Sequence, residues 1–167
     1  MSAHVETPPS LLVDTNVWLD YYLGWRSGHA AAAELIVAAC EQGAELLYAA
    51  PAVTDVFYLV AVELKRRARA AAGGTLEEGV AAAAGEAAWG CIEHLDEIAG
   101  AVGCDGSDLC TARKQKPLHA DFEDDLLIAA AMRSDASLLV TNDAALIAHA
   151  PVAALSVADA LRYLRTR

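Results

Sequence analysis

Four segments of this sequence place acidic residues at a point where a strand should end or a helix begin. Asp14 and Asp143 each follow a short apolar run. Asp55 stands at the start of an apolar helical pattern, and residues 121–125 hold four acids. Asp is a preferred helix N-cap, so each acid alone is explained by capping. Together, they could also ligate a hard divalent cation through carboxylate oxygens.

The positions of these acids depend on strands that alternate with helices. Short continuous apolar runs are typical of buried parallel strands and lie at 11–13, 46–48 and 138–140, with weaker strands expected near Val102 and within 153–156. Helical spacing covers 17–23, 29–42, 51–72, 76–98, 108–115, 121–132, 144–149 and 158–165. This alternation predicts an α/β fold with helices on both faces of a central parallel sheet.

The predicted sheet should bring the acids together. Parallel strands present their carboxyl ends at one edge, where the following helices begin. Asp121, Asp124 and Asp125 are spaced i, i+3 and i+4, which is one face of a helix. Carboxylates gathered in this way repel one another, and burial raises their pKa values. Mg²⁺ or Mn²⁺ relieves both effects and supports phosphoryl chemistry, with one or two ions bound.

Composition and charge bound the other possibilities. With 167 residues the chain should form one domain, at residues 11–167, after a loose leader at residues 1–10. A net charge of −11 argues against broad electrostatic attraction to nucleic acid or to an anionic membrane. The apolar stretches are too short to span a membrane. The first ten residues do not resemble a secretory signal, so we expect a cytoplasmic protein.

The motifs around these acids resemble those of a known family. The run Leu12-Val13-Asp14-Thr15-Asn16-Val17-Trp18-Leu19-Asp20 is similar to the opening of PIN-domain proteins, which include the VapC ribonuclease toxins of bacterial toxin–antitoxin pairs. Three further matches follow in the family's order: Thr54-Asp55, then Asp121-Phe122-Glu123-Asp124 before three alanines, then Leu139-Val140-Thr141-Asn142-Asp143. The resemblance spans residues 11 to about 164 and implies a PIN-like three-layer α/β/α fold.

The same resemblance implies an activity and a site. The activity is Mg²⁺- or Mn²⁺-dependent hydrolysis of RNA phosphodiester bonds by an endoribonuclease. The catalytic acids it implies are Asp14, Asp55, Asp124 and Asp143, with Asp14, Asp121, Asp124 and Asp143 as metal ligands. Asn16 and Thr141 would support the carboxylates through hydrogen bonds. Asp125 is the neighbour of Asp124, and helical periodicity leaves open which of the two faces the ion.

Partners follow from the resemblance and from local charge. A toxin of this family would pair with a small antitoxin protein that masks the acidic site, and PIN proteins commonly form homodimers. Two basic stretches could contact the RNA backbone through Arg66, Arg67, Arg113 and Lys114. The alternative is that these cations are solvated helix ends, where positive charge is favourable.

Three other functions remain to be weighed. A PIN-like protein could serve as a non-catalytic protein-interaction module whose acids only cap helices. It could also be an RNA-processing nuclease outside toxin–antitoxin systems. A haloacid-dehalogenase-like phosphatase is disfavoured, because Asn16 stands two positions after Asp14, where that chemistry needs a second Asp.

Overall fold

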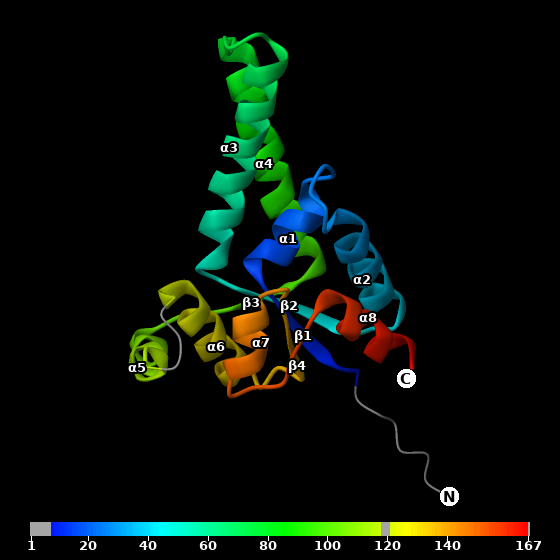
Figure 1. Ribbon diagram of the computed structural model, residues 1–167, viewed down its shortest axis with the longest axis vertical. Coiled ribbons are helices and arrows are strands. Elements are labelled where there is room, and N and C mark those ends of the chain that lie inside the picture. Colours follow the sequence, from blue (N-terminus) through cyan, green and yellow to red (C-terminus); the bar gives the residue numbers. More distant parts are fainter. Residues whose placement is uncertain (1–7, 118–120, 167) are drawn as a thin grey trace, which may run out of the picture.

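A five-stranded parallel sheet forms the centre of the molecule (Figure 1). The computed structural model describes residues 8–117 and 121–166. Its strands are β1 (Ser10–Val13), β2 (Glu45–Ala49), β3 (Gly100–Val102), β4 (Leu138–Val140) and β5 (Ala154–Leu155). They are ordered β3-β2-β1-β4-β5, and every neighbouring pair is parallel. The leader prediction falls largely on residues 1–7, which lie outside the described residues, and Ser10 already belongs to β1.

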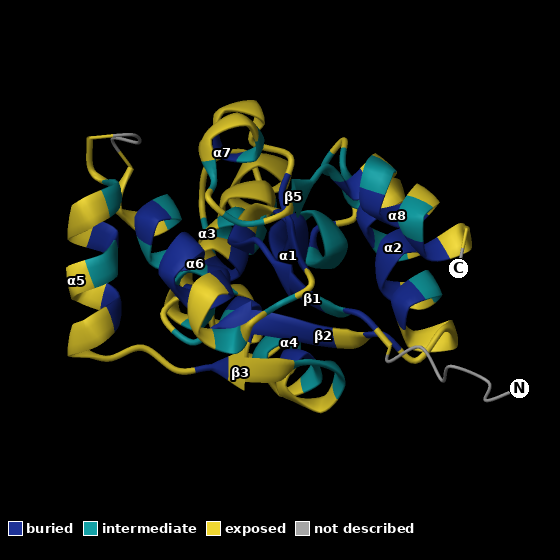
Figure 2. Cartoon of the chain, turned by 90° about the horizontal axis from the view of Figure 1, so that it is seen from below, coloured by how far each residue is buried: buried dark blue, intermediate teal, exposed yellow. Residues whose placement is uncertain are grey.

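Alternate residues of the central strands face opposite sides of the sheet. Leu12 is paired in register with Leu47 of β2 and Leu139 of β4, and all three join one hydrophobic cluster. Leu11 and Val13 join the other cluster. Because both faces are covered, these strands are apolar throughout, as buried parallel strands are. Figure 2 shows β1 as buried between the helical layers.

Helices cover both faces of the sheet. They are α1 (Thr15–Tyr22), α2 (His29–Glu41), α3 (Ala52–Ala71), α4 (Glu78–Ile98), α5 (Gly106–Gln115), α6 (Phe122–Ser134), α7 (Ala144–His149) and α8 (Val157–Arg165). Residues of α1, α2, α3, α4 and α8 enter the cluster with Leu11, whereas α6 and α7 enter the cluster with Leu12. The predicted three-layer α/β/α fold with a central parallel sheet is therefore confirmed. In the part of the chain that the structure describes, no helix is long and apolar enough to cross a membrane.

The helices α3 and α4 form a paired arm that projects away from the sheet (Figure 1). Gly73 and Gly74 connect them with positive φ angles of 70° and 107°, which L side chains rarely adopt. Buried alanines of α4, Ala84 and Ala88, leave room for the two helices to approach closely. The inner end of this arm brings the start of α3 to the carboxyl edge of the sheet.

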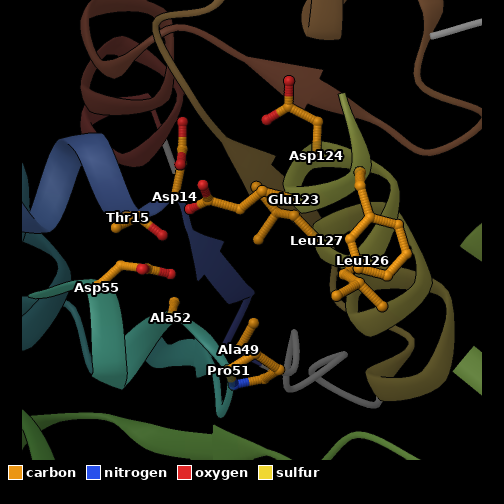
Figure 3. A pocket seen from close by; sticks show the side chains of 11 residues that line it. Asp14, Thr15, Ala49, Pro51, Ala52, Asp55, Glu123, Asp124, Leu126 and Leu127 are labelled. Atoms are coloured by element: carbon orange, nitrogen blue, oxygen red, sulfur yellow. The ribbon is translucent and has the colours of Figure 1, made fainter. Parts of the chain in front are cut away.

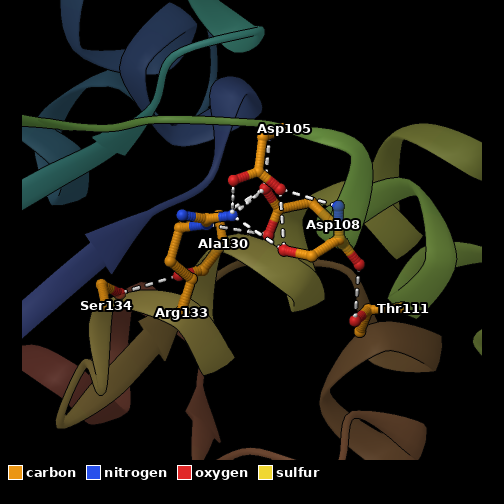
Figure 4. A network of polar contacts seen from close by, with 7 residues as sticks. Asp105, Asp108, Thr111, Ala130, Arg133 and Ser134 are labelled. Carbon is orange, nitrogen blue, oxygen red and sulfur yellow. Dashed lines mark hydrogen bonds and ion pairs between the residues drawn. The ribbon is translucent and has the colours of Figure 1, made fainter.

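An ion-pair network fixes α6 against α5 (Figure 4). Asp105 caps α5 in a capping box with Asp108, whose Oδ2 accepts the Asp105 N–H at 2.7 Å. Near the end of α6, Arg133 Nη2 contacts Asp105 Oδ2 at 2.6 Å and Asp108 Oδ2 at 2.8 Å. Hydrogen bonds from Ser107 and Arg133 lower the pKa of Asp105 to about 2. The network is therefore charged at neutral pH and holds in place the helix that carries Glu123 and Asp124.

Candidate active site

The order of the strands predicts where a ligand binds. The chain leaves β1 toward β2 on one side, while β4 lies on the other side of β1, so the connections diverge between β1 and β4. In open parallel sheets, ligands bind in the crevice at the carboxyl ends of such strands. Asp14 follows β1 and Thr141 follows β4 at this point.

A pocket of about 190 Å³ opens beside Asp14 (Figure 3). Residues from the end of β1, from the turn after β2 and from the first turns of α3 and α6 surround it. They are Asp14, Thr15, Ala49, Pro51, Ala52, Asp55, Phe122, Glu123, Asp124, Leu126 and Leu127. Three of the four acids expected to be catalytic, Asp14, Asp55 and Asp124, therefore line one pocket. Glu123 lines the same pocket.

Asp14 is the most buried of these acids, with 5% of its surface exposed. Its backbone N–H donates to the carbonyl of Val140 at 3.0 Å, which extends the pairing of β1 with β4. Its side chain caps α1 by accepting the N–H of Asn16 at 3.3 Å. Burial is the main cause that raises the pKa of Asp14, and the charge of Asp143 adds to it, while the hydrogen bond from Thr141 opposes both. Asp14 is therefore a carboxylate that gains from a nearby cation.

Thr141 connects Asp14 with Asp143. Its fully buried hydroxyl donates to Asp14 Oδ2 at 2.7 Å and accepts the N–H of Asp143 at 3.0 Å. Asp143 caps α7, and its Oδ1 accepts the N–H groups of Ala145 and Leu146. This short chain of hydrogen bonds fixes the orientation of Asp14 from the neighbouring strand. The exposed Asn16 contributes its backbone N–H to the same carboxylate.

On the other side of the pocket, α3 and α6 each contribute acids. Asp55 lies in the first turn of α3 and Glu123 in the first turn of α6. Withdrawal from water and the charge of Asp55 raise the pKa of Glu123, a hydrogen bond from Thr15 lowers it, and Asp14 and Asp121 raise it further. Glu123 was not among the residues that the sequence predicted for the site. One sequence signal was available: Glu123 stands four residues before the apolar Leu127, so the two share one face of the helix. In the structure both line this pocket.

The remaining acids of α6 differ in their positions. Asp121 caps the helix, and its Oδ1 accepts the N–H of Glu123 at 2.9 Å. Asp124 lines the pocket, although its carboxylate stands apart from the other three in Figure 3. Asp125 is buried, with 3% of its surface exposed, and it is not among the described residues that line the pocket. The positions favour Asp124 over Asp125 as the acid that faces a ligand.

The acids match a divalent cation in ligand type. All the candidate ligands are carboxylates, which Mg²⁺ and Mn²⁺ prefer to nitrogen or sulfur. The pairs Asp14 with Asp143 and Asp55 with Glu123 are close enough for mutual repulsion, which a cation offsets. Within residues 8–117 and 121–166, however, no group of three or more His, Cys, Asp or Glu is gathered tightly enough to hold an ion. Side-chain rotation is therefore required before three of them can share one ion.

The four cations predicted to contact substrate lie elsewhere. Arg66 pairs with Glu63 of its own helix at 2.7 Å, and the Arg67 guanidinium lies 4.3 Å from the centroid of the Trp25 ring. Arg113 and Lys114 are exposed in the last turn of α5. None of the four is among the described residues that line the pocket. Any contact of these four side chains with RNA would therefore lie outside the acidic pocket.

A family model matches most of the chain. The model described as PIN domain covers residues 10–145, from the first strand to the start of α7. This chain belongs to the PIN-domain family. PIN domains are generally metal-dependent nucleases, and the matched region of this one contains all the acids described above. A search of curated proteins finds no match.

Two solved structures share the fold of this PIN domain. One is VapBC2 from Rickettsia felis, solved with a DNA fragment from its promoter, at 12% identity and a TM-score of 0.57 over 88% of this chain and 98% of that one. The other is PAE2754 from Pyrobaculum aerophilum, at 18% identity and a TM-score of 0.58 over 99% of this chain and 97% of that one. At these identities the likeness shows the fold and leaves the function to be argued from the site.

Proposed function

We propose that this PIN domain is an endoribonuclease that hydrolyses RNA phosphodiester bonds with Mg²⁺ or Mn²⁺. The observation that carries the proposal is the buried carboxylate of Asp14 at the divergence of the sheet, fixed by Thr141 and facing acids from other elements. A buried acid that is repelled by its neighbours costs stability, and such groups cluster at sites whose function needs the charge. Binding a cation is such a role.

In this proposal, Asp14, Asp121, Asp124 and Asp143 would hold the metal, and Asp55 would complete the acidic set. When bound, the metal supplies positive charge to the phosphate and activates a water molecule. Thr141 keeps Asp14 oriented toward the crevice through the 2.7 Å hydrogen bond. Water attacks phosphorus, and the bond from phosphorus to the 3′ oxygen breaks, leaving a 5′-phosphate and a 3′-hydroxyl. No side chain becomes covalently attached to the substrate.

The choice of RNA and of a toxin role comes from the resemblance to VapC toxins. If this PIN domain is a toxin, a small antitoxin protein should cover the pocket, and two copies of the domain should associate. Exposed apolar side chains near the pocket support a protein partner. Phe122 at its rim is 57% exposed, and Tyr58 and Leu59 follow Asp55 at i+3 and i+4 on α3 and are 61% and 43% exposed.

A second candidate is the non-catalytic interaction module, which a specific observation favours. Asp14, Asp121 and Asp143 each accept backbone N–H groups at the start of a helix. Capping alone therefore accounts for part of the acidic pattern. It does not account for Asp55 and Glu123, whose side chains cap no helix in the part of the chain described and face the same pocket.

Cleavage assays separate the two candidates. We expect the purified protein to cut single-stranded RNA in the presence of Mn²⁺ or Mg²⁺, and to lose this activity in EDTA and regain it when the metal is restored. A DNA oligonucleotide of the same sequence serves as the matched substrate and should be cut more slowly. Absence of metal-dependent cleavage across a mixed set of RNA sequences, by a protein shown to be folded, would favour the interaction module.

A further inference from the structure

Three arginines from two distant segments of the chain converge beside α3, on the half of that helix that lies away from the sheet. Arg66 Nη2 contacts Glu63 Oε2 at 2.7 Å. Arg26, in the loop after α1, donates from Nε to Asp20 Oδ1 at 2.5 Å. The hydrogen bond from Arg66 lowers the pKa of Glu63, and the charges of Arg26 and Arg67 lower it further, so all three lie near one carboxylate. These three residues are called the arginine cluster below.

The cations of this region outnumber the acids that pair with them in the part of the chain described. Residues 65–69 contain four cations and Arg26 adds a fifth, against the two acids named above. This local excess stands in a chain whose net charge is −11. The helix dipole favours cations only in the last turn, which in α3 contains Arg69. The dipole therefore does not explain the other cations, and a bound anion would.

The arginines of α3 are placed so that they can bind phosphate. The Arg67 guanidinium carbon lies 4.3 Å from the centroid of the Trp25 ring, which holds the group in position by a cation–π contact. The guanidinium keeps N–H donors that the ring does not use. Arg66 and Arg67 are exposed and line an open hollow of about 560 Å³ beside alanines of residues 68–71. Guanidinium groups bind phosphate oxygens through paired hydrogen bonds, so a phosphate matches this hollow in charge and in donors.

The helical register connects the arginine cluster with the acidic pocket. Arg66 follows Asp55 by 11 residues, which is three turns of α3, so both lie on one face about 17 Å apart. Tyr58 and Val62 lie between them toward the same face and are 61% and 54% exposed. An exposed aromatic ring is a surface on which a base can stack. A strand with one phosphate in the pocket can therefore continue outward along α3 to Arg66.

We propose that the arginine cluster binds the phosphate backbone of single-stranded RNA at a distance from the bond that is cut. This inference rests on the proposed ribonuclease function for the identity of the ligand, and it adds a second contact surface that includes Arg26 of the loop. An acidic protein segment has the same sign of charge. RNA is favoured because one polyanion would reach the pocket and the cluster along a single face. The cluster touches no reacting atom, so it contributes to binding and not to the chemical step.

Fluorescence anisotropy with a labelled single-stranded RNA of about 12 nucleotides and mixed sequence tests this inference. Binding is measured in EDTA, where the strand is not cut. We expect Arg66→Gln with Arg67→Gln to weaken binding by at least about 10-fold. The slope of log Kd against log salt should fall by about 1.4, since each phosphate contact on a single strand contributes about 0.7. Arg26→Gln should also weaken binding. Arg162→Gln with Arg165→Gln makes the same charge change on the exposed end of α8 and should bind RNA like the wild type.

Cleavage of the same RNA in saturating Mn²⁺ provides a second measurement. The variant with both α3 arginines replaced should have a higher KM and an unchanged kcat, because it loses binding that is equal in the ground state and the transition state. The ion pair of Arg66 with Glu63 is exposed and contributes little to stability, so each variant should keep the Tm of the wild type.

The outcomes separate this inference from the proposed function. Wild-type affinity and KM in the folded α3 variant, with cleavage by the wild type, would overturn the role of the arginine cluster alone. An acidic protein segment would then be the better ligand for this surface. Failure of the wild type to bind RNA in EDTA, or an equal loss in the α8 control, would also overturn it. Binding that depends on the α3 arginines, without metal-dependent cleavage, would support the cluster and contradict the nuclease.

Discussion

Asp14→Asn is expected to reduce metal-dependent RNA cleavage by more than about 100-fold, since even residues that only support a metal ligand contribute about 10- to 100-fold. Asn keeps the shape of the side chain and remains a good N-cap for α1, so the fold should be retained. The negative charge is what the substitution removes. Cleavage rates in saturating Mn²⁺, compared with the wild type, measure the effect.

The stability of the same variant provides an independent measurement. Burial and Asp143 raise the pKa of Asp14, so its contribution to stability is present below the unfolded pKa and is lost as pH rises through the folded pKa. Without metal, the Tm of Asp14→Asn should therefore match or exceed that of the wild type at neutral pH. The difference should shrink as pH falls toward about 4, where unfolded Asp residues become protonated. A variant that is unfolded, or that retains full activity, would contradict this account of Asp14.

Trp18→Ala should have the largest effect on stability. Trp18 lies in α1, four residues after Asp14, and is fully buried between the sheet and the neighbouring helices. Its ring stacks with Tyr22 at a centroid separation of 6.5 Å and meets Tyr21 edge-on at 6.3 Å. Truncating a buried Trp to Ala costs about 3–5 kcal/mol. For a chain of this size, that loss lowers Tm by about 6–20 °C.

Trp25→Ala is the matched control for this substitution. Trp25 is 38% exposed, against 0% for Trp18, and carries Arg67 over its ring, so its truncation removes less buried surface. We expect Tm to fall by less than in Trp18→Ala, because part of the Trp25 ring is already in water and the exposed cation–π contact adds only about 0.5–1 kcal/mol. Thermal unfolding followed by circular dichroism compares the two variants. Equal losses in both would show that the core around α1 is not packed as described.

The sequence predicted the elements of the fold because each strand and helix has a local signature. The apolar runs that end at Asp14 and Thr141 identify β1 and β4, and Gly43, Gly73 and Gly74 mark helix ends. The order of the strands has no such signature. That β4 lies beside β1 depends on long-range packing, and this neighbour relation creates the crevice at Asp14.

The candidate site was predictable in part for the same reason. Asp14 and Asp143 are placed by strand ends, so their position could be read from the pattern. The choice among the acids of α6 depends on how that helix is rotated, which is set by the packing of Leu127 and Ile128 against the sheet. Because of that rotation, Glu123 faces the pocket while Asp125 is buried, and periodicity alone could not separate them.

Mn²⁺ titration of the wild-type protein, with Asp14→Asn as the comparison, tests the central claim most directly. The account predicts saturable binding to the wild type, with a rise in Tm, and loss of both in the variant. Absence of saturable binding to folded wild-type protein would contradict the claim. The acids would then be helix caps and pocket-lining residues without a catalytic role.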